Sequence, residues 1–348
     1  MGVNAKFTEV ITAVLIMIAS VFGQSNANSP QANKNHESPP LRIVQEIPLP
    51  NVVGRIDHFT LNQKRKLVIG SALGNNTVEV IDVFAGRVIH TVPGIPEPQG
   101  VLYVPDPINK LYVASAEDGK LRIYDGKSYT LISTLDFEEN TDNLRYDANE
   151  KRVYVGYGED EKSAIGVVDA TTNQRLDDAG KLDSHPESFQ VESPGSNIYV
   201  NIASKEKVAV INRKTHQVKE WPLTGVKANF PMALDQADHR LFIGTRKPAR
   251  LVVVDTDSGK IVANVPSAGD MDDLYYDDSR KRVYVPGGEG FISVFEQKDP
   301  DHYEEIARIA SAIGARTGVW YGKRDRLYLA VPGRANQGAA VWVYEAQD

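Results

Sequence analysis

The sequence predicts an all-β protein folded as a seven-bladed β-propeller with four-stranded antiparallel blades. One unit recurs seven times, and successive units begin 42 to 45 residues apart. Each unit holds short runs of β-branched and aromatic residues, separated by Gly, Asn and charged residues that favour turns. Periodicity typical of helices is nearly absent from these units. Four short strands in a repeat of about 43 residues are typical of a propeller blade.

Each unit starts with an apolar strand and continues, after a turn, with an alternating strand such as Val78–Ile81. An outer strand follows, as at Arg87–Val92, and an inner strand precedes the unit, as at Phe59–Leu61. These four strands together make one antiparallel blade. The first apolar residues of the seven units are Leu67, Leu111, Val153, Ile198, Leu241, Val283 and Leu327.

The two ends of the chain predict how the ring closes. The last unit ends soon after Tyr344 and has no outer strand of its own. Conversely, Leu41–Pro48 resembles an outer strand but belongs to no unit. We therefore expect the N-terminal strand to close the last blade, so that no blade is left incomplete. Residues 41–348 are then predicted to form one propeller domain.

The first 27 residues (1–27) are predicted to be a secretory signal peptide. Lys6 precedes the apolar run Ile11–Phe22, which is too short to cross a hydrocarbon core of about 30 Å as a helix. Small residues, Ser25 and Ala27, stand at the positions that define a cleavage site. An uncleaved anchor is the alternative. Residues 28–40 are polar and contain Pro, which predicts a disordered linker. We therefore expect a secreted or periplasmic protein with no membrane span after cleavage.

Composition excludes several classes of function. The formal net charge is −7 and Lys and Arg form no dense run, so we expect no nucleic-acid partner. The chain has no Cys, which excludes disulfides, thiolate catalysis and Cys-ligated zinc, haem or iron–sulfur centres. We expect the protein to be a monomer.

Short motifs within the units resemble those of a known repeat family. Tyr112–Ser115 and Tyr199–Ile202 approximate a Tyr-Val-Thr-Asn run, and the ending Val-Ile-Asp recurs at Val80–Asp82 and Val167–Asp169. Over about residues 41–345 the chain resembles the YVTN-type β-propeller repeat and looks like the secreted YncE-like group. The resemblance implies the fold. It does not imply one function, because similar propellers include surface-layer proteins, quinoprotein dehydrogenase subunits, lactonases and an antibiotic lyase.

The candidate site lies where the loops leading into the inner strands converge on the propeller axis. The polar residues predicted to bind a ligand there are Asp57, Gln99, Asp142, Asn143, Glu187, Asn229, Asp272, Asp273 and Arg316. A competing interpretation applies to three of them. Asp57, Asp142 and Asp272 recur at equivalent places, where a short acidic side chain accepts backbone N–H bonds within a turn.

Two histidines give the candidate site its chemistry. His58 and His185 are predicted catalytic residues, acting as general acid and base if the ring desolvates them. With carboxylates such as Asp57, Glu187 and Asp272, they can instead hold a divalent metal ion such as Zn²⁺, Mn²⁺ or Ca²⁺. Because the histidines are 127 positions apart, their meeting depends entirely on the ring.

Two functions therefore remain open from the sequence. The first is a secreted propeller that binds a small molecule, a glycan or a protein at its channel face. The second is an enzyme of the lactonase or lyase type with its site at the same axial mouth, where Arg316 holds an anionic substrate. DNA binding, as in some YncE-like proteins, is disfavoured because only Arg246, Lys247 and Arg250 form a basic cluster.

Overall fold

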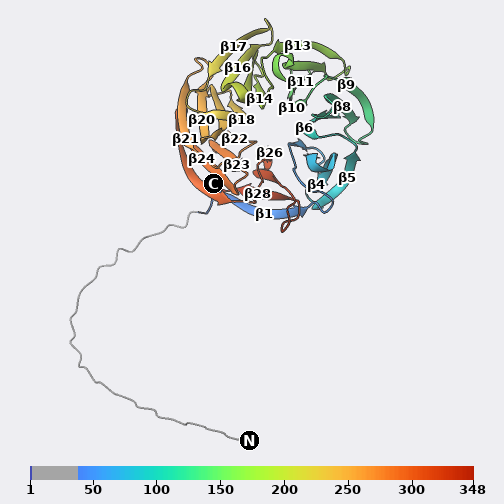
Figure 1. Cartoon of the computed structure of the whole chain (residues 1–348), viewed down its shortest axis with the longest axis vertical. Coiled ribbons are helices and arrows are strands. Elements are labelled where there is room, and N and C mark those ends of the chain that lie inside the picture. Colours follow the sequence, from blue (N-terminus) through green and yellow to red (C-terminus); the bar gives the residue numbers. More distant parts are fainter. Residues whose placement is uncertain (2–37) are drawn as a thin grey trace, which may run out of the picture. The chain divides into compact units, whose positions relative to one another are not determined.

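Seven four-stranded antiparallel sheets surround a central axis, as predicted (Figure 1). The computed structural model describes Met1 and residues 38–348. Apart from Met1 and residues 38–40, the predicted signal peptide (1–27) and linker (28–40) lie outside the described residues. Within the described residues, no helix has the length and apolar character needed to cross a membrane.

The blades are numbered here in chain order, and each runs from its inner to its outer strand. Blade 1 comprises β2 (Phe59–Asn62), β3 (Leu67–Ala72), β4 (Thr77–Asp82) and β5 (Arg87–Pro93), and blade 2 comprises β6 (Pro98–Val104), β7 (Lys110–Ser115), β8 (Lys120–Asp125) and β9 (Leu131–Asp136). Blade 3 comprises β10 (Thr141–Asp147), β11 (Arg152–Tyr157), β12 (Ala164–Asp169) and β13 (Arg175–Lys181), and blade 4 comprises β14 (Phe189–Val191), β15 (Asn197–Ile202), β16 (Lys207–Asn212) and β17 (Gln217–Pro222).

The last three blades follow the same order. Blade 5 comprises β18 (Lys227–Asp235), β19 (Arg240–Lys247), β20 (Ala249–Asp255) and β21 (Ile261–Pro266), and blade 6 comprises β22 (Tyr275–Asp277), β23 (Arg282–Gly287), β24 (Phe291–Asp299) and β25 (His302–Ala310). Blade 7 comprises β26 (Gly318–Tyr321), β27 (Arg326–Val331), β28 (Ala340–Ala346) and β1 (Leu41–Pro48). Single 3₁₀ turns in the described chain are η1 (Leu73–Asn75), η2 (Asp160–Lys162), η3 (Ala203–Lys205) and η4 (Gly322–Arg324).

The N-terminal strand closes blade 7, which confirms the prediction from the chain ends. β1 pairs antiparallel with β28, and the pairing runs from Leu41 opposite Ala346 to Pro48 opposite Ala340. Figure 1 shows β1, in blue, beside the red C-terminal strands. The side chains of Leu41 and Ile47 are buried, so β1 is anchored by packing as well as by backbone hydrogen bonds.

One outer strand escapes the sequence pattern. β13 has the sequence RLDDAGK, which carries three charged residues in its first four and lacks apolar alternation. It nevertheless pairs with β12, with a register shift between Ile165 and Val167. Pairing with a strong neighbouring strand overrides a weak local propensity, because most of this outer strand has no core to face.

The core lies between neighbouring blades, where an aromatic residue at the second position of the repeat packs. Tyr112, Tyr199 and Tyr284 hold this position and are fully buried. The rings of Tyr199 and Trp221 have centroids 5.6 Å apart, and those of Tyr284 and Trp320 are 4.9 Å apart. Tyr199 therefore packs against an aromatic side chain of its own blade, and Tyr284 against one of the next blade.

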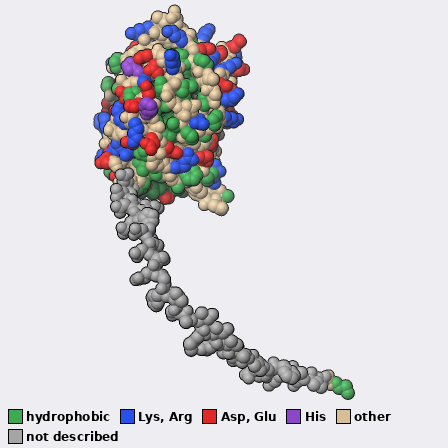
Figure 2. All heavy atoms as spheres, turned by 90° about the vertical axis from the view of Figure 1, so that its left-hand side faces the viewer, with side chains coloured by type: hydrophobic (Ala, Val, Ile, Leu, Met, Phe, Trp, Pro, Cys, Tyr) green, Lys and Arg blue, Asp and Glu red, His purple; other side chains and the backbone are tan. Residues whose placement is uncertain are grey.

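The surface carries charges of both signs. On the side of the propeller drawn in Figure 2, basic and acidic side chains are interspersed rather than gathered into separate areas. This side therefore presents no continuous basic face of the kind that binds a phosphate backbone.

Candidate functional site

A cavity of about 240 Å³ lies at the axis and receives side chains from all seven blades. We call it the axial pocket. This convergence follows from ring closure, because each blade directs one or more loops toward the axis. The residues that line the axial pocket are Arg55, His58, Gln99, Asn140, Asp142, Asn143, His185, Glu187, Ser188, Phe230, Arg246, Asp272 and Arg316.

A second cavity of about 380 Å³ shares two lining residues with the axial pocket, His58 and Asn143. It is lined by apolar residues of the inner strands together with Arg145, Asp273 and Tyr275. We call it the channel cavity. His58 and Asn143 therefore contact both cavities.

β-bulges at the start of three inner strands help to aim side chains into the axial pocket. The strand register shifts at Pro98–Val101, Thr141–Leu144 and Asn229–Met232. A bulge turns side chains away from the regular alternation and is often found beside functional sites. Pocket-lining residues within these irregular segments are Gln99, Asp142, Asn143 and Phe230.

The structure brings most of the predicted site residues together. Those that line the axial pocket are His58, Gln99, Asp142, Asn143, His185, Glu187, Asp272 and Arg316. Three lie elsewhere. Asp57 is fully buried next to Arg55, and Asp273 lines the channel cavity. Asn229 is also fully buried, and its amide donates hydrogen bonds to Asn201 Oδ1 at 2.9 Å and to the Lys207 carbonyl at 3.1 Å, so it holds blades 4 and 5 together rather than facing a ligand.

Five lining residues are not among the predicted site residues. These are Arg55, Asn140, Ser188, Phe230 and Arg246. Arg55 could have been found from its loop, because it stands two positions before Asp57. Arg246 stands near the end of β19, in the hairpin expected at the axial face, and nothing in the sequence distinguishes it from the exposed Lys247 beside it.

Three arginines surround one carboxylate on one wall of the pocket, which we call the arginine wall. Asp272 accepts Arg246 Nη2 at 2.6 Å and lies 3.1 Å from Arg316 Nε and 3.4 Å from Arg55 Nη2. Asp57 and Asp270 lie outside the pocket lining and neutralise part of this charge, at 2.8 Å from Arg55 and 2.6 Å from Arg316. The carboxylates fix the guanidinium groups in place before any ligand arrives.

Donor groups of the arginine wall remain free. Arg246 uses Nε on the Met271 carbonyl at 2.8 Å and Nη2 on Asp272, and its guanidinium lies over the Phe230 ring, 4.0 Å from the centroid. Arg316 uses Nη1 on Asp270. Among the described residues, no hydrogen bond uses Arg246 Nη1 or Arg316 Nη2. These N–H groups can therefore donate to a ligand.

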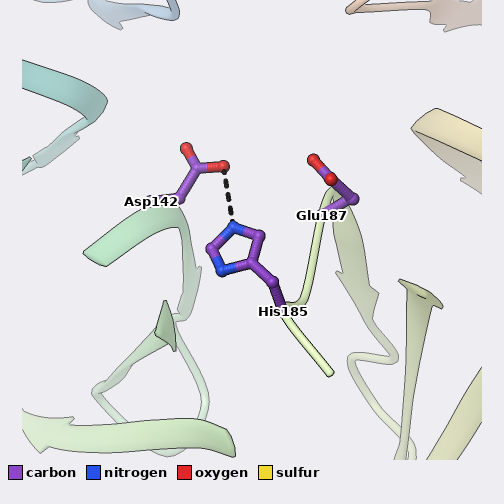
Figure 3. A group of neighbouring side chains, drawn as sticks. All are labelled: Asp142, His185 and Glu187. Atoms are coloured by element: carbon purple, nitrogen blue, oxygen red, sulfur yellow. Dashed lines mark ion pairs between the residues drawn. The ribbon is translucent and has the colours of Figure 1, made fainter. Parts of the chain in front are cut away.

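The second wall of the pocket consists of His185 and the carboxylates of Asp142 and Glu187 (Figure 3). We call it the acidic wall. His185 Nδ1 lies 2.7 Å from the Gly158 carbonyl, and Nε2 lies 3.8 Å from Asp142 Oδ2. One ligand atom from each of the three residues lies within 4.8 Å of the others.

Burial and mutual charge perturb the acidic wall. Burial, and then the charge of Asp142, raise the pKa of Glu187 to about 7. Burial by itself would raise the pKa of Asp142, but His185 and His58 bring it below its usual value. Burial by itself would lower the pKa of His185, but Asp142 outweighs this and raises it to about 9. Such opposed shifts in one cavity are typical of binding and catalytic sites.

His58 is surrounded by carboxylates. Its Nδ1 lies 3.3 Å from Asp273 Oδ1, and its Nε2 lies 3.6 Å from Asp57 Oδ1 and 3.9 Å from Asp142 Oδ1. Burial by itself would lower the pKa of His58, but the charges of Asp273 and Asp57 raise it above its usual value. The imidazole is therefore a cation at neutral pH, which suits a general acid or a structural counter-ion and does not suit the general base among the predicted roles.

The fold and the site define a seven-bladed β-propeller with a charged axial pocket. No family model matches the sequence, so the resemblance to the YVTN-type repeat has no such support. The chain is similar to the uncharacterized protein YncE of Salmonella typhi and of Salmonella typhimurium. Both matches are 28% identical over 159 residues and cover 44% of this chain. The chain spans only 44% of the length of these curated relatives.

Solved structures of other propellers share the architecture. A chain of hydrazine synthase from Kuenenia stuttgartiensis superimposes with a TM-score of 0.71 at 14% identity, covering 81% of this chain and 94% of that one. The WD40 repeats of RRP9 give a TM-score of 0.73 at 10% identity, covering 88% and 98%. At such low identity these likenesses show the fold alone.

Proposed function

We propose that the axial pocket binds a small molecule that carries a carboxylate or phosphate group. The observation that carries this proposal is the arginine wall, where three guanidinium groups converge with free N–H donors. Arg246 Nη1 and Arg316 Nη2 can each donate a charge-assisted hydrogen bond to an oxygen of a carboxylate or phosphate. Arg246 and Arg316 are held in place by Asp272, so little side-chain entropy is lost when a ligand binds.

The size of the pocket favours a small molecule over a glycan chain or a protein segment. Its volume of about 240 Å³ lies at the small end of the range for small-molecule pockets. The acidic wall faces the same space and restricts the ligand further, since an anion must keep its negative group toward the arginines.

Thermal denaturation with a panel of small anions tests the proposal. The panel contains hydroxycarboxylic acids, sugar acids and phosphate monoesters, added with EDTA so that metal ions play no part. A ligand at 100 times its Kd stabilises the native state by about 2.7 kcal/mol, which raises Tm measurably. We expect Arg316→Gln to weaken binding of the active compound at least about tenfold, because it removes a charge-assisted hydrogen bond.

Arg308→Gln is the matched control, since Arg308 is exposed on the outer strand β25 and pairs only with Glu305 among the described residues. It should bind as the parent does. The proposal fails if no member of the panel raises Tm, or if Arg316→Gln and Arg308→Gln bind the active compound equally well.

An enzyme of the lactonase or lyase type is the second candidate. It is favoured by the presence of Glu187 in the same pocket as the arginine wall, since among the described residues its carboxylate forms no hydrogen bond and no ion pair. A carboxyl group with a pKa near 7 is suited to exchange protons at neutral pH. Analysis of the bound compound for a ring-opened or eliminated product distinguishes turnover from simple binding.

We also propose that the protein acts outside the cytosol, in the periplasm or the medium. The support is the short apolar run Ile11–Phe22 followed by small residues. The mature protein recovered from its native host is expected to begin at Asn28. N-terminal sequencing that finds Met1 or Gly2 in the exported fraction argues for an uncleaved anchor instead.

A further inference from the structure

We propose that Asp142, His185 and Glu187 form a binding site for one divalent transition-metal ion, Zn²⁺ or Mn²⁺. The inference deepens the proposed function, because this site shares the axial pocket with the arginine wall. It does not depend on the identity of the anionic ligand, and it makes its own measurable prediction.

The histidine is oriented as a metal ligand requires. His185 Nδ1 donates to the Gly158 carbonyl at 2.7 Å, which fixes the ring and assigns the proton to this nitrogen. Nε2 faces the side on which Asp142 and Glu187 lie, as Figure 3 shows. A bound cation would replace the proton on Nε2 and take up its lone pair. Metal-binding histidines are commonly oriented by a backbone carbonyl in this way.

Asp142 is buried and lacks a partner that burial normally demands, whereas Glu187 is partly exposed. Asp142 is only 6% exposed, yet its Oδ1 has no hydrogen-bond partner among the described residues. Its Oδ2 accepts a hydrogen bond from Asn143 Nδ2 at 3.2 Å. Glu187 forms neither a hydrogen bond nor an ion pair through its carboxylate in residues 38–348. Buried carboxylate oxygens without partners are costly, and a bound cation removes that cost.

The geometry needs only a small adjustment to close around an ion. Metal–ligand bonds of about 2.0–2.2 Å place neighbouring ligand atoms roughly 3–3.5 Å apart. His185 Nε2 and Asp142 Oδ2 are 3.8 Å apart, and one ligand atom from each of the three residues lies within 4.8 Å of the others. To bind an ion, the ligand atoms would have to approach one another by roughly 1–2 Å at most.

The backbone behind the ligands is fixed. A Cβ atom at Gly100 would lie 2.0 Å from the Asp142 carbonyl oxygen, so the inner strands of blades 2 and 3 approach as only glycine allows. The Glu187 N–H donates to the Asn201 carbonyl at 3.0 Å. Ligands held on a fixed backbone lose little entropy when they bind an ion.

The set of donors selects the ion. One imidazole nitrogen and two carboxylate oxygens suit Zn²⁺ and Mn²⁺, whereas Ca²⁺ takes six to eight oxygen ligands and Mg²⁺ usually keeps several waters. Three protein ligands leave at least one position for water or for an oxygen of the anion on the arginine wall. The residues differ from those expected from the sequence, because Asp57 and Asp272 are already paired with arginines.

Metal analysis of the purified propeller after loading with Zn²⁺ or Mn²⁺ and dialysis tests the site. We expect about one ion per chain in the parent, and titration calorimetry should show an apparent Kd at least about 100-fold higher in His185→Ala and Glu187→Gln. Co²⁺ loading provides a visible absorption spectrum that reports the ligands directly. His239→Ala is the matched control, since His239 is exposed and pairs with Asp257 at 3.2 Å; it should retain the ion.

The inference is overturned if the parent retains no ion, or if the two ligand variants retain it as the parent does. Glu187→Gln keeps the size and shape of the side chain, so a loss of metal with an unchanged far-UV spectrum reports the site rather than unfolding. Failure of the metal site leaves the anion test intact, because that test is run in EDTA and depends on Arg316. Failure of the anion test likewise leaves the retained ion measurable.

Discussion

A chain that lacks residues 38–48 is expected to lose its cooperative unfolding transition. The deletion removes β1, the outermost strand of blade 7, and with it the buried side chains of Leu41 and Ile47. Burying each side chain of this size contributes about 1.5–3 kcal/mol. With the lost strand pairing, the total reaches at least about 5 kcal/mol, comparable with the whole stability of an ordinary domain. Urea denaturation followed by circular dichroism measures the loss.

A circular permutant is the control for this deletion. The Gln347 N–H donates to the Pro40 carbonyl at 3.0 Å, so the start of β1 lies beside the end of β28. A chain that begins near residue 49 and carries residues 41–48 after Asp348, joined by a short turn, should recover the transition. If the deletion variant unfolds as cooperatively and as late as the parent, β1 does not close the ring in the way described here.

Arg213→Ala is expected to destabilise the native state by about 3–5 kcal/mol, because it leaves a buried carboxylate without its counter-ion. Arg213 Nη1 lies 2.5 Å from Asp147 Oδ2 and 3.1 Å from Tyr154 Oη, and Nη2 donates to the Glu192 and Gly195 carbonyls at 2.9 and 2.6 Å. The Arg213 side chain is 6% exposed and that of Asp147 is 1% exposed. One guanidinium therefore joins blades 3 and 4. Chemical denaturation gives the free energy directly.

The dependence on pH provides an independent check of this ion pair. Burial by itself would raise the pKa of Asp147, but the hydrogen bonds from Arg213 and Ser193 outweigh it and hold the pKa below its usual value. The ion pair therefore stabilises the native state above about pH 3.9, which is the pKa of Asp147 in the unfolded chain. This stabilisation is lost as the pH falls through the lower pKa of Asp147 in the folded protein. The parent should lose more stability than Arg213→Ala on acidification.

Lys219→Ala, on the exposed outer strand β17, is the control for the Arg213→Ala substitution and should change stability by less than about 0.5 kcal/mol. If Arg213→Ala and Lys219→Ala lower the free energy of unfolding equally, the ion pair of Arg213 with Asp147 does not have the role described here.

The fold could be predicted because it repeats. Each unit repeats the same alternation and turns, so that one weak local signal is seen seven times. Where the repeat lapses, prediction fails, as for β13, whose polar sequence RLDDAGK is held in place by pairing with β12. The missing strand of blade 7 was found because Leu41–Pro48 had no other place in the repeat.

The candidate site could be predicted only in outline. Ring symmetry places the start of every inner strand at the axis, which is why His58 and His185 were both located. The orientation of a side chain depends on bulges that the sequence does not reveal, and Asn229 is turned into the sheet for this reason. The sequence also does not show whether a carboxylate has a cationic partner, because that partner comes from another blade. Asp272 and Glu187 look alike in the sequence, yet Asp272 meets three arginines and Glu187 has no such partner among the described residues.

The propeller can close only after the whole chain has been synthesised, because blade 7 contains both the first strand and the last. β1 leaves the ribosome long before β28, and among the described residues theirs is the strand pairing of greatest separation in sequence. A prematurely terminated chain leaves β1 without its mate and blade 7 with exposed backbone groups, which favours proteolysis and aggregation.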